Sequence, residues 1–366
     1  MEICIIGLPK SGKTTIFNAL TKGKSQIAAY APSALEPNVG AAKVKEPRLQ
    51  ALETIFKPRK TTFAEIRYVD IALAARSTKK GSSVSGQFLN YLSNANALLH
   101  VIRAFEDENI PHVEGSIDPK RDIAIMDLEL ALSDLIIIER RSERLEPSLK
   151  SAKLGERDSL IKEQALLRKI KAGLDSEIPI WQQGLSPEEI RGLANYQFLT
   201  AKPMLVVINI SEGQLPRVAS IETELRSTCR YTDFEVAVLC GKLEMELSQL
   251  NDGEAEEFRR ELGLAEPALD RIVRLSYQLL GLISFFTTVS SELKAWTIPS
   301  GTTALQAAGK IHTDIEKGFI RAEVINFYDL NRYGSIAEAK RQGLLRLEGK
   351  NYIVRDGDII TFLFNI

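Results

Sequence analysis

The sequence predicts an α/β fold built around a mostly parallel sheet, and two observations support this. First, short apolar runs typical of buried strands alternate with helix-like segments over residues 1 to about 118. Second, the first of these runs, Ile3–Ile6, leads through a glycine-containing loop into the helix-like stretch Thr15–Leu20. Parallel strands need a crossover between them, usually a helix, so this alternation favours a sheet with helices on its faces.

The loop from Gly7 to Thr14 fits the phosphate-binding pattern G-x-x-x-x-G-K-[ST] at every fixed position. Its glycines let backbone N–H groups wrap a triphosphate, and the following helix N-terminus adds partial positive charge. Lys13 is expected to reach the β- and γ-phosphates, and the Thr14 hydroxyl to ligate Mg²⁺. The residues expected to surround the phosphates are Pro9, Lys10, Ser11, Gly12, Lys13, Thr14 and Thr15.

Composition limits the class of protein. The 366 residues are 44% hydrophobic and 26% charged, which is typical of a soluble globular chain of two or three domains. The net charge of −1 gives no global attraction to nucleic acid or to a membrane. The chain starts directly with a strand, and no uncharged apolar stretch is long enough to span a bilayer. We expect a cytoplasmic protein that does not bind membranes.

A helical insertion is predicted to divide the chain. From Asp122 to Leu145 apolar residues recur at helical spacing, and a second helical stretch covers about 157–174. The basic middle of this hairpin, residues 140–171, holds 10 Lys/Arg against 5 Asp/Glu, which predicts a solvated tip or a patch for RNA or an acidic partner. The expected apolar face of the first helix consists of Ile125, Leu128, Leu132, Leu135 and Ile138. The predicted domains are 1–120 with 200–282 for the nucleotide, 121–199 for the hairpin, and 283–366.

The residues after two later strand candidates bear on the choice of base. Asn209 and Glu212 lie at the C-terminal end of a buried run, where open α/β sheets bind ligands. GTPases usually carry Asn-Lys-x-Asp there, and the longer Glu212 does not suit the paired donors of guanine. We therefore predict ATP as the bound nucleotide. Cys240 and Gly241 end the next strand and are expected to place backbone N–H groups near the base.

Longer motifs make the chain similar to the YchF-type Obg-like ATPases, over nearly its whole length. The segments that carry this resemblance are 35–40, 110–115, 209–212, 295–299, 307–314, 316–323 and 348–352. The resemblance implies a P-loop ATPase domain with an inserted helical hairpin, and a C-terminal TGS domain of β-grasp-like fold. It also implies association with ribosomes or ribosomal RNA, and a monomeric protein.

The resemblance extends to the reaction. Lys13 and Asp70 are the expected catalytic residues, with Asp70 also holding Mg²⁺ together with Thr14. Two switch positions depart from the family: Leu73 replaces a glycine, and Ala34 replaces a threonine that completes the Mg²⁺ shell. Ser33 is the shifted candidate ligand. Two functions therefore stay open: a slow Mg²⁺-dependent ATPase that acts as a nucleotide switch, or a non-hydrolysing, ATP-gated ribosome- or RNA-binding module.

The C-terminal region offers a further candidate for RNA contact. Lys310, Lys317 and Arg321 are interleaved with Phe319, a combination of cations and an aromatic ring that suits single-stranded RNA. A solvent-exposed sheet edge explains the same pattern.

Overall fold

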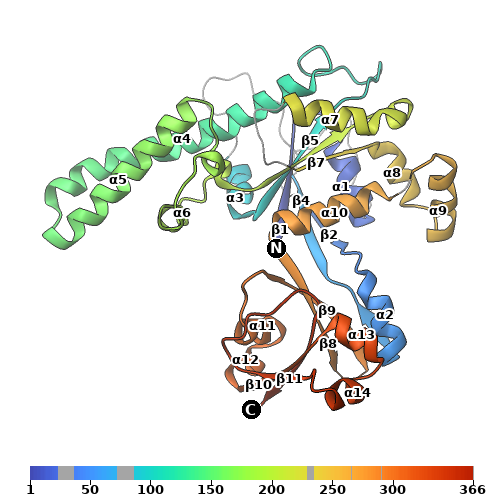
Figure 1. The fold of residues 1–366 in the computed structure, drawn as a ribbon. Coiled ribbons are helices and arrows are strands. Elements are labelled where there is room, and N and C mark those ends of the chain that lie inside the picture. The colour runs from blue at the N-terminus through green and yellow to red at the C-terminus, as the bar shows by residue number, and fades with distance from the viewer. Residues whose placement is uncertain (24–36, 72–85, 229–234, 265, 290, 366) are drawn as a thin grey trace. The chain divides into compact units, whose positions relative to one another are not determined.

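The structure, a computed structural model, describes residues 1–23, 37–71, 86–228, 235–264, 266–289 and 291–365 (Figure 1). It forms two compact units. Unit 1 comprises residues 1–40 and 67–268, and unit 2 comprises residues 41–66 and 269–366. This division differs from the boundaries predicted from the sequence, because 41–66 joins the C-terminal unit and the helical hairpin stays with the nucleotide core.

Unit 1 is built on a six-stranded sheet of order β2-β4-β1-β5-β6-β7. The strands are β1 Glu2–Ile6, β2 Asn38–Lys43, β4 Glu65–Asp70, β5 Ala97–Arg103, β6 Met204–Asn209 and β7 Glu235–Leu239. β1 pairs in parallel with β4 and β5, and β5, β6 and β7 continue the parallel pairing. The C-terminal ends of these strands therefore share one edge, the edge expected to bind a ligand.

The helices of unit 1 are α1 Lys13–Thr21, α3 Gly86–Asn94, α4 Pro119–Ser151, α5 Leu154–Asp175, α6 Pro187–Leu193, α7 Val218–Thr228, α8 Gly241–Leu247 and α9 Asp252–Glu261. Helix α10 Ala268–Leu279 starts at the last residue of unit 1 and otherwise belongs to unit 2. Short 3₁₀ turns lie at Ile180–Gln182, Leu199–Ala201 and Glu212–Arg217. All seven residues of β5 are buried, as expected for a central parallel strand with both faces covered. In the described part of the chain, no helix combines the length and apolar character that crossing a membrane requires.

The predicted hairpin is present as α4 and α5, which run side by side (green in Figure 1). Asp118 caps α4 by accepting from the N–H groups of Lys120 and Arg121, and Pro119 occupies the first turn. The predicted apolar face of α4 is wrong in its first half. Leu128 and Leu132 are 56% and 42% exposed, while the buried residues there are Met126 and Leu130.

One buried carboxylate ties α4 to the start of β6. Asp134 is fully buried and accepts from the N–H groups of Leu199 and Thr200, both at 2.8 Å, and from the Thr200 hydroxyl at 2.7 Å. Burial raises the pKa of Asp134 to about 6, although these hydrogen bonds act in the opposite direction. Beyond Asp134, the two helices of the hairpin pack through a separate apolar cluster that includes Ile138 and Leu167.

Unit 2 has its own six-stranded sheet, of order β11-β10-β12-β8-β9-β3. Its strands are β3 Lys60–Thr62, β8 Leu282–Val289, β9 Glu292–Pro299, β10 Phe319–Asn326, β11 Arg346–Glu348 and β12 Asp358–Phe364. Its helices are α2 Pro47–Phe56, α11 Ala304–Ile311, α12 Thr313–Lys317, α13 Phe327–Tyr333 and α14 Ile336–Arg341. Phe319 is only 5% exposed and packs in the core with Phe285 and Ala308, so its ring is not placed to stack on RNA.

Candidate functional site: the phosphate-binding loop

The loop between β1 and α1 has the backbone of a phosphate-binding loop. Gly7 has φ +145°, and a Cβ there would lie 2.3 Å from the carbonyl oxygen of Val101 on β5. Gly12 has φ +95° and is the N-cap of α1, so no side chain covers the first turn of this helix. Both positions require glycine for close approach as well as for backbone conformation. The uncapped helix end leaves backbone N–H groups and the positive end of the helix dipole for an anion.

Lys13 is buried in the loop. Its ammonium donates to the carbonyl oxygens of Gly7, at 3.0 Å, and Leu8, at 2.9 Å. Burial lowers the pKa of Lys13 to about 8, while the negative charge of Asp70 acts in the opposite direction. Two neutral carbonyl groups do not balance the positive charge of this buried ammonium. The ammonium is therefore available to pair with an anion that binds in the loop.

Thr14 and Asp70, which we expect to hold Mg²⁺, lie together. The Thr14 hydroxyl donates to Oδ2 of Asp70 at 2.7 Å. Asp70 is 2% exposed, and its Oδ1 is buried without a hydrogen-bond partner among the described residues. A hydroxyl beside an unsatisfied carboxylate oxygen suits a hard cation such as Mg²⁺, which uses few protein ligands and completes its shell with phosphates and water. No group of three or more His, Cys, Asp or Glu side chains suited to a metal occurs among the described residues.

Asn209 connects the loop to the end of β7. Its Nδ2 donates to the carbonyl oxygen of Ser11 at 3.0 Å, and its Oδ1 accepts from the N–H of Gly241 at 2.9 Å. A Cβ on Gly12 would lie 2.2 Å from Nδ2 of Asn209, so this side chain fits only beside a glycine. The Gly241 N–H that we expected near the base thus bonds Asn209, which positions the loop.

The remaining predicted base contacts differ in exposure. Glu212 is exposed, and its carboxylate lies 3.6 Å from the ammonium of Lys242, which is also exposed. Cys240 is 4% exposed, and burial raises the pKa of its thiol. Its side chain packs in an apolar cluster with residues of β6 and β7.

The other predicted contacts are placed as follows. Ser11 is buried in the loop, and Lys10 is exposed with φ 64°. Pro9 and Thr15 are half-buried. Ser33, the candidate Mg²⁺ ligand, lies outside the described residues, as do Ala34 and Leu73.

One histidine lies in β5 and another follows it in the sequence. His100, in β5, is 1% exposed, and neither ring nitrogen has a partner in the described part of the chain. Burial, followed by the charge of Lys13, lowers the pKa of His100 to about 3, so it is neutral and a poor proton acceptor at pH 7. His112 instead lies with Nε2 2.9 Å from a carboxylate oxygen of Asp122, and both side chains are 3% exposed. Sequence reasoning missed this pair, because the nine residues between them carry no spacing signal.

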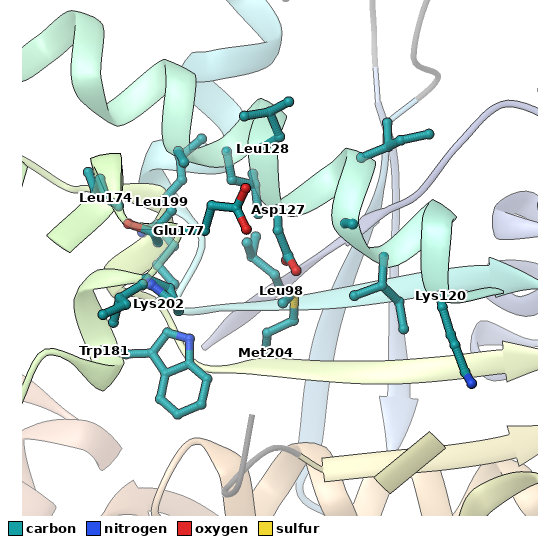
Figure 2. A pocket seen from close by; sticks show the side chains of 18 of the residues that line it. Leu98, Lys120, Asp127, Leu128, Leu174, Glu177, Trp181, Leu199, Lys202 and Met204 are labelled. Atoms are coloured by element: carbon teal, nitrogen blue, oxygen red, sulfur yellow. The ribbon is translucent and has the colours of Figure 1, made fainter. Parts of the chain in front are cut away.

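A cavity of about 560 Å³ lies elsewhere in unit 1, between α4 and residues 174–204 (Figure 2). Its lining is mostly apolar and includes Leu128 and Trp181. Leu98 and Met204, which also line it, lie at the N-terminal ends of β5 and β6. The phosphate-binding loop follows the C-terminal end of β1, so this cavity is separate from the nucleotide site.

Comparisons with known proteins cover both units. The family model described as "50S ribosome-binding GTPase" matches residues 2–138, and a model for the C-terminal domain of YchF proteins, described as of unknown function, matches residues 282–365. The "Ribosome-binding ATPase YchF" of Escherichia coli O157:H7 is 41% identical over 362 residues, covering 99% of this chain and 98% of that protein. The protein of the same name from Bacillus subtilis is 39% identical over 364 residues, with the same coverage.

A solved structure agrees with these sequence matches. The structure titled "Structure of the Schizosaccharomyces pombe YchF GTPase" superposes with a TM-score of 0.86 at 30% identity, covering 99% of this chain and 97% of that one. Identity at this level over the whole of both chains, together with the loop, hairpin and C-terminal sheet described above, is evidence of common descent. The chain belongs to the YchF family.

Proposed function

We propose that this protein binds ATP with Mg²⁺, hydrolyses it slowly, and acts as a nucleotide switch on the ribosome. The observation that carries the proposal is the arrangement of Lys13, Thr14 and Asp70 in and beside the loop. The buried ammonium would balance negative charge on the phosphates, and the hydroxyl–carboxylate pair would bind the metal ion that accompanies a triphosphate. The bacterial relatives are named ribosome-binding ATPases, which supports the same assignment.

The preference for ATP rests on the segment after β6. Guanine recognition in GTPases uses a short aspartate, whereas this chain has the longer Glu212, whose carboxylate lies 3.6 Å from the ammonium of Lys242. The fission yeast relative and the matching family model both carry the word GTPase, so direct competition is the necessary test. Displacement of a fluorescent ATP analogue should need a much higher concentration of GTP than of ATP. Equal or stronger displacement by GTP would reverse the assignment.

Mg²⁺ would be held by the Thr14 hydroxyl and by Asp70, either directly or through water. When bound, the ion would supply positive charge that neutralises the charge developing on the phosphates. Asp70→Asn keeps the shape of the side chain but removes its charge. We expect this variant to bind ATP with a weaker dependence on Mg²⁺ in a titration at fixed ATP. An unchanged Mg²⁺ midpoint would remove Asp70 from the site.

Loss of the loop lysine tests the function as a whole. Lys13→Ala removes the ammonium that would pair with the phosphates, and we expect ATP binding to fall about a hundredfold or more, with phosphate release falling in parallel. Lys310→Ala, which removes an exposed lysine of unit 2, is the matched control and should retain both activities. If Lys13→Ala bound ATP like the wild type, the loop would not be the nucleotide site.

The second candidate function is an ATP-gated binding module without turnover, and the residues that favour it are Leu73 and Ala34. His112 separates the two candidates. It follows β5 in the sequence, and Asp122 beside it would orient its ring as a proton acceptor in hydrolysis. In the ATPase, His112→Ala should lower phosphate release at least tenfold with little loss of ATP affinity. If the protein is a binding module without turnover, the wild type shows no phosphate release that depends on Lys13, so His112→Ala has no activity to lower.

The expected partner is the ribosome, and the expected location is the cytoplasm, with the protein acting as a monomer. The ribosome as partner rests on the names of the relatives and not on a docking surface identified in the fold. Co-sedimentation of the purified protein with ribosomes, in ATP or in ADP, tests the first of them. A switch should bind differently in the two nucleotides. Equal binding in both would leave a ribosome-associated protein without a nucleotide switch.

A further inference from the structure

We propose that residues 41–66, here called the connector, transmit the state of the nucleotide site to unit 2. The chain leaves unit 1 after Gly40 and returns to it at Arg67. Between these points it forms α2 and β3, which belong to unit 2. The proposal rests on the ATP binding proposed above and adds to it a route by which bound nucleotide acts on the C-terminal unit.

An arginine of the connector fixes it within unit 2. Arg48 donates to both carboxylate oxygens of Glu46, at 2.6 and 2.7 Å, and to those of Asp356, at 2.7 and 3.2 Å. Its guanidinium also lies 5.4 Å from the centre of the Phe286 ring. Asp356 in turn accepts from the N–H of Ser284 on β8. The pair with Glu46 lies within the connector and orients the guanidinium, and the bidentate pair with Asp356 joins α2 to the turn that bonds β8.

The strand of the connector is the second attachment. β3 pairs in parallel with β9 over three residues, Lys60–Thr62. Both Thr62, at 2.6 Å, and Lys60, at 3.1 Å, contact the carboxylate of Glu292, and the N–H of Arg59 donates to Ser291. The connector is therefore the edge strand of the unit 2 sheet, and displacing it would break main-chain as well as side-chain bonds.

Both ends of the connector continue into strands that contact α1, the helix that begins in the phosphate-binding loop. On the entering side, Gly40 in β2 packs so closely on α1 that a Cβ would lie 2.6 Å from Cγ2 of Thr21 and 3.1 Å from the Phe17 ring. On the leaving side, β4 runs from the connector to Asp70, which accepts the hydroxyl of Thr14. The N–H of Val44 donates to the carbonyl of Ala64 at 2.8 Å and joins the two ends of the connector.

A change at the nucleotide site therefore reaches the connector by two routes. Mg²⁺ and phosphates compete for the Thr14 hydroxyl and for the free oxygen of Asp70, and so act on β4. Any shift of α1 acts on β2 through Gly40. Because coupling between two sites is reciprocal, a perturbation of the connector within unit 2 must also change the affinity for ATP.

Hydrogen exchange of the full chain, read by mass spectrometry with and without Mg·ATP, tests the proposal. We expect bound Mg·ATP to change exchange in β3 and β9 by about fivefold or more. Asp356→Asn, which weakens the attachment of Arg48, should reduce that change and shift ATP affinity. Thr303→Ala is the matched control, because it removes the side-chain cap of α11, in unit 2, and touches no residue of the connector.

The results separate this proposal from the proposed function. If wild-type protein binds ATP and exchange in β3 and β9 stays the same, the connector does not transmit and ATP binding stands. If Asp356→Asn and Thr303→Ala shift ATP affinity equally, the effect is general destabilisation and the proposal fails. A shift with Asp356→Asn alone supports it. If the wild type binds no ATP at all, the proposed function itself is wrong.

Discussion

Asn209 donates from its side-chain amide to the carbonyl oxygen of Ser11, 198 positions earlier in the chain. This bond and the one to Gly241 hold the phosphate-binding loop against the end of β7. Asn209→Ala removes both bonds and leaves buried polar groups unpaired, at a cost of about 1–3 kcal/mol. We therefore expect ATP affinity to fall about tenfold to a hundredfold, measured by isothermal titration.

A second asparagine provides the control for that experiment. Asn251 caps α9 through the N–H of Glu254, so Asn251→Ala lowers stability by about 1 kcal/mol without touching the loop. Its ATP affinity should equal that of the wild type. If both variants lost affinity alike, Asn209 would act through global stability and not by positioning the loop.

Gly12 and Asn209 should be energetically coupled. A methyl group on Gly12 would lie 2.2 Å from the Asn209 amide nitrogen, on a backbone with φ +95°. Gly12→Ala thus carries a steric cost and a backbone cost, and Asn209→Ala removes only the steric one. In a double-mutant cycle on ATP affinity, the combined loss should be smaller than the sum of the two single losses. Strict additivity would show that the two residues do not meet in solution.

Lys13 should make ATP binding sensitive to alkaline pH. The pKa of the free protein's Lys13 is about 8 rather than 10.5, so the ammonium is lost as the pH rises through 8. Bound phosphate restores a high pKa, and affinity should therefore fall by up to tenfold per pH unit above 8. Lys13→Arg stays protonated, and its weaker binding should be flat over the same range. A wild-type affinity that is constant from pH 7 to 9.5 would contradict the buried ammonium.

His100 should destabilise the fold in acid. Its pKa is about 3 in the folded protein and about 6.5 when unfolded, so the unfolded chain takes up a proton as the pH falls below 6.5. Between pH 7 and pH 5 this costs about 2 kcal/mol of stability, which His100→Phe should not lose. Urea unfolding at both pH values measures the difference. His312→Asn, at an exposed histidine that caps α12, should follow the wild type.

The central sheet and the phosphate-binding loop could be predicted because their signals lie in short, continuous stretches of the sequence. The burial of all seven residues of β5 fits the alternation of strand-like and helix-like segments that predicted a parallel sheet. The place of Thr14 came from the glycine pattern of the loop, and that of Asp70 from the family resemblance. Such signals are local, and the fold did not have to be known to find them.

Other features depend on partners distant in the sequence. β3 is three polar residues, Lys60–Thr62, which show no strand pattern until β9 lies beside them. On α4, apolar spacing fits two neighbouring faces, and only the packing of Met126 and Leu130 against the sheet selects the buried one. Asn209 was predicted as a contact to the base, and its bonds to Ser11 and Gly241 could not be foreseen from one strand end.

Asp134 also shows how the insertion is built. Up to this residue α4 packs on the sheet as an ordinary crossover helix between β5 and β6. Asp134 then accepts hydrogen bonds from Leu199 and Thr200, where the chain comes back from the hairpin towards β6. The hairpin is thus an outgrowth of one existing helix, and its excisable part begins after Asp134 and ends before Leu199. A shortened chain joined by a brief glycine linker between these two points should keep the nucleotide core, which makes the hairpin a module that could be gained or lost in a single genetic step.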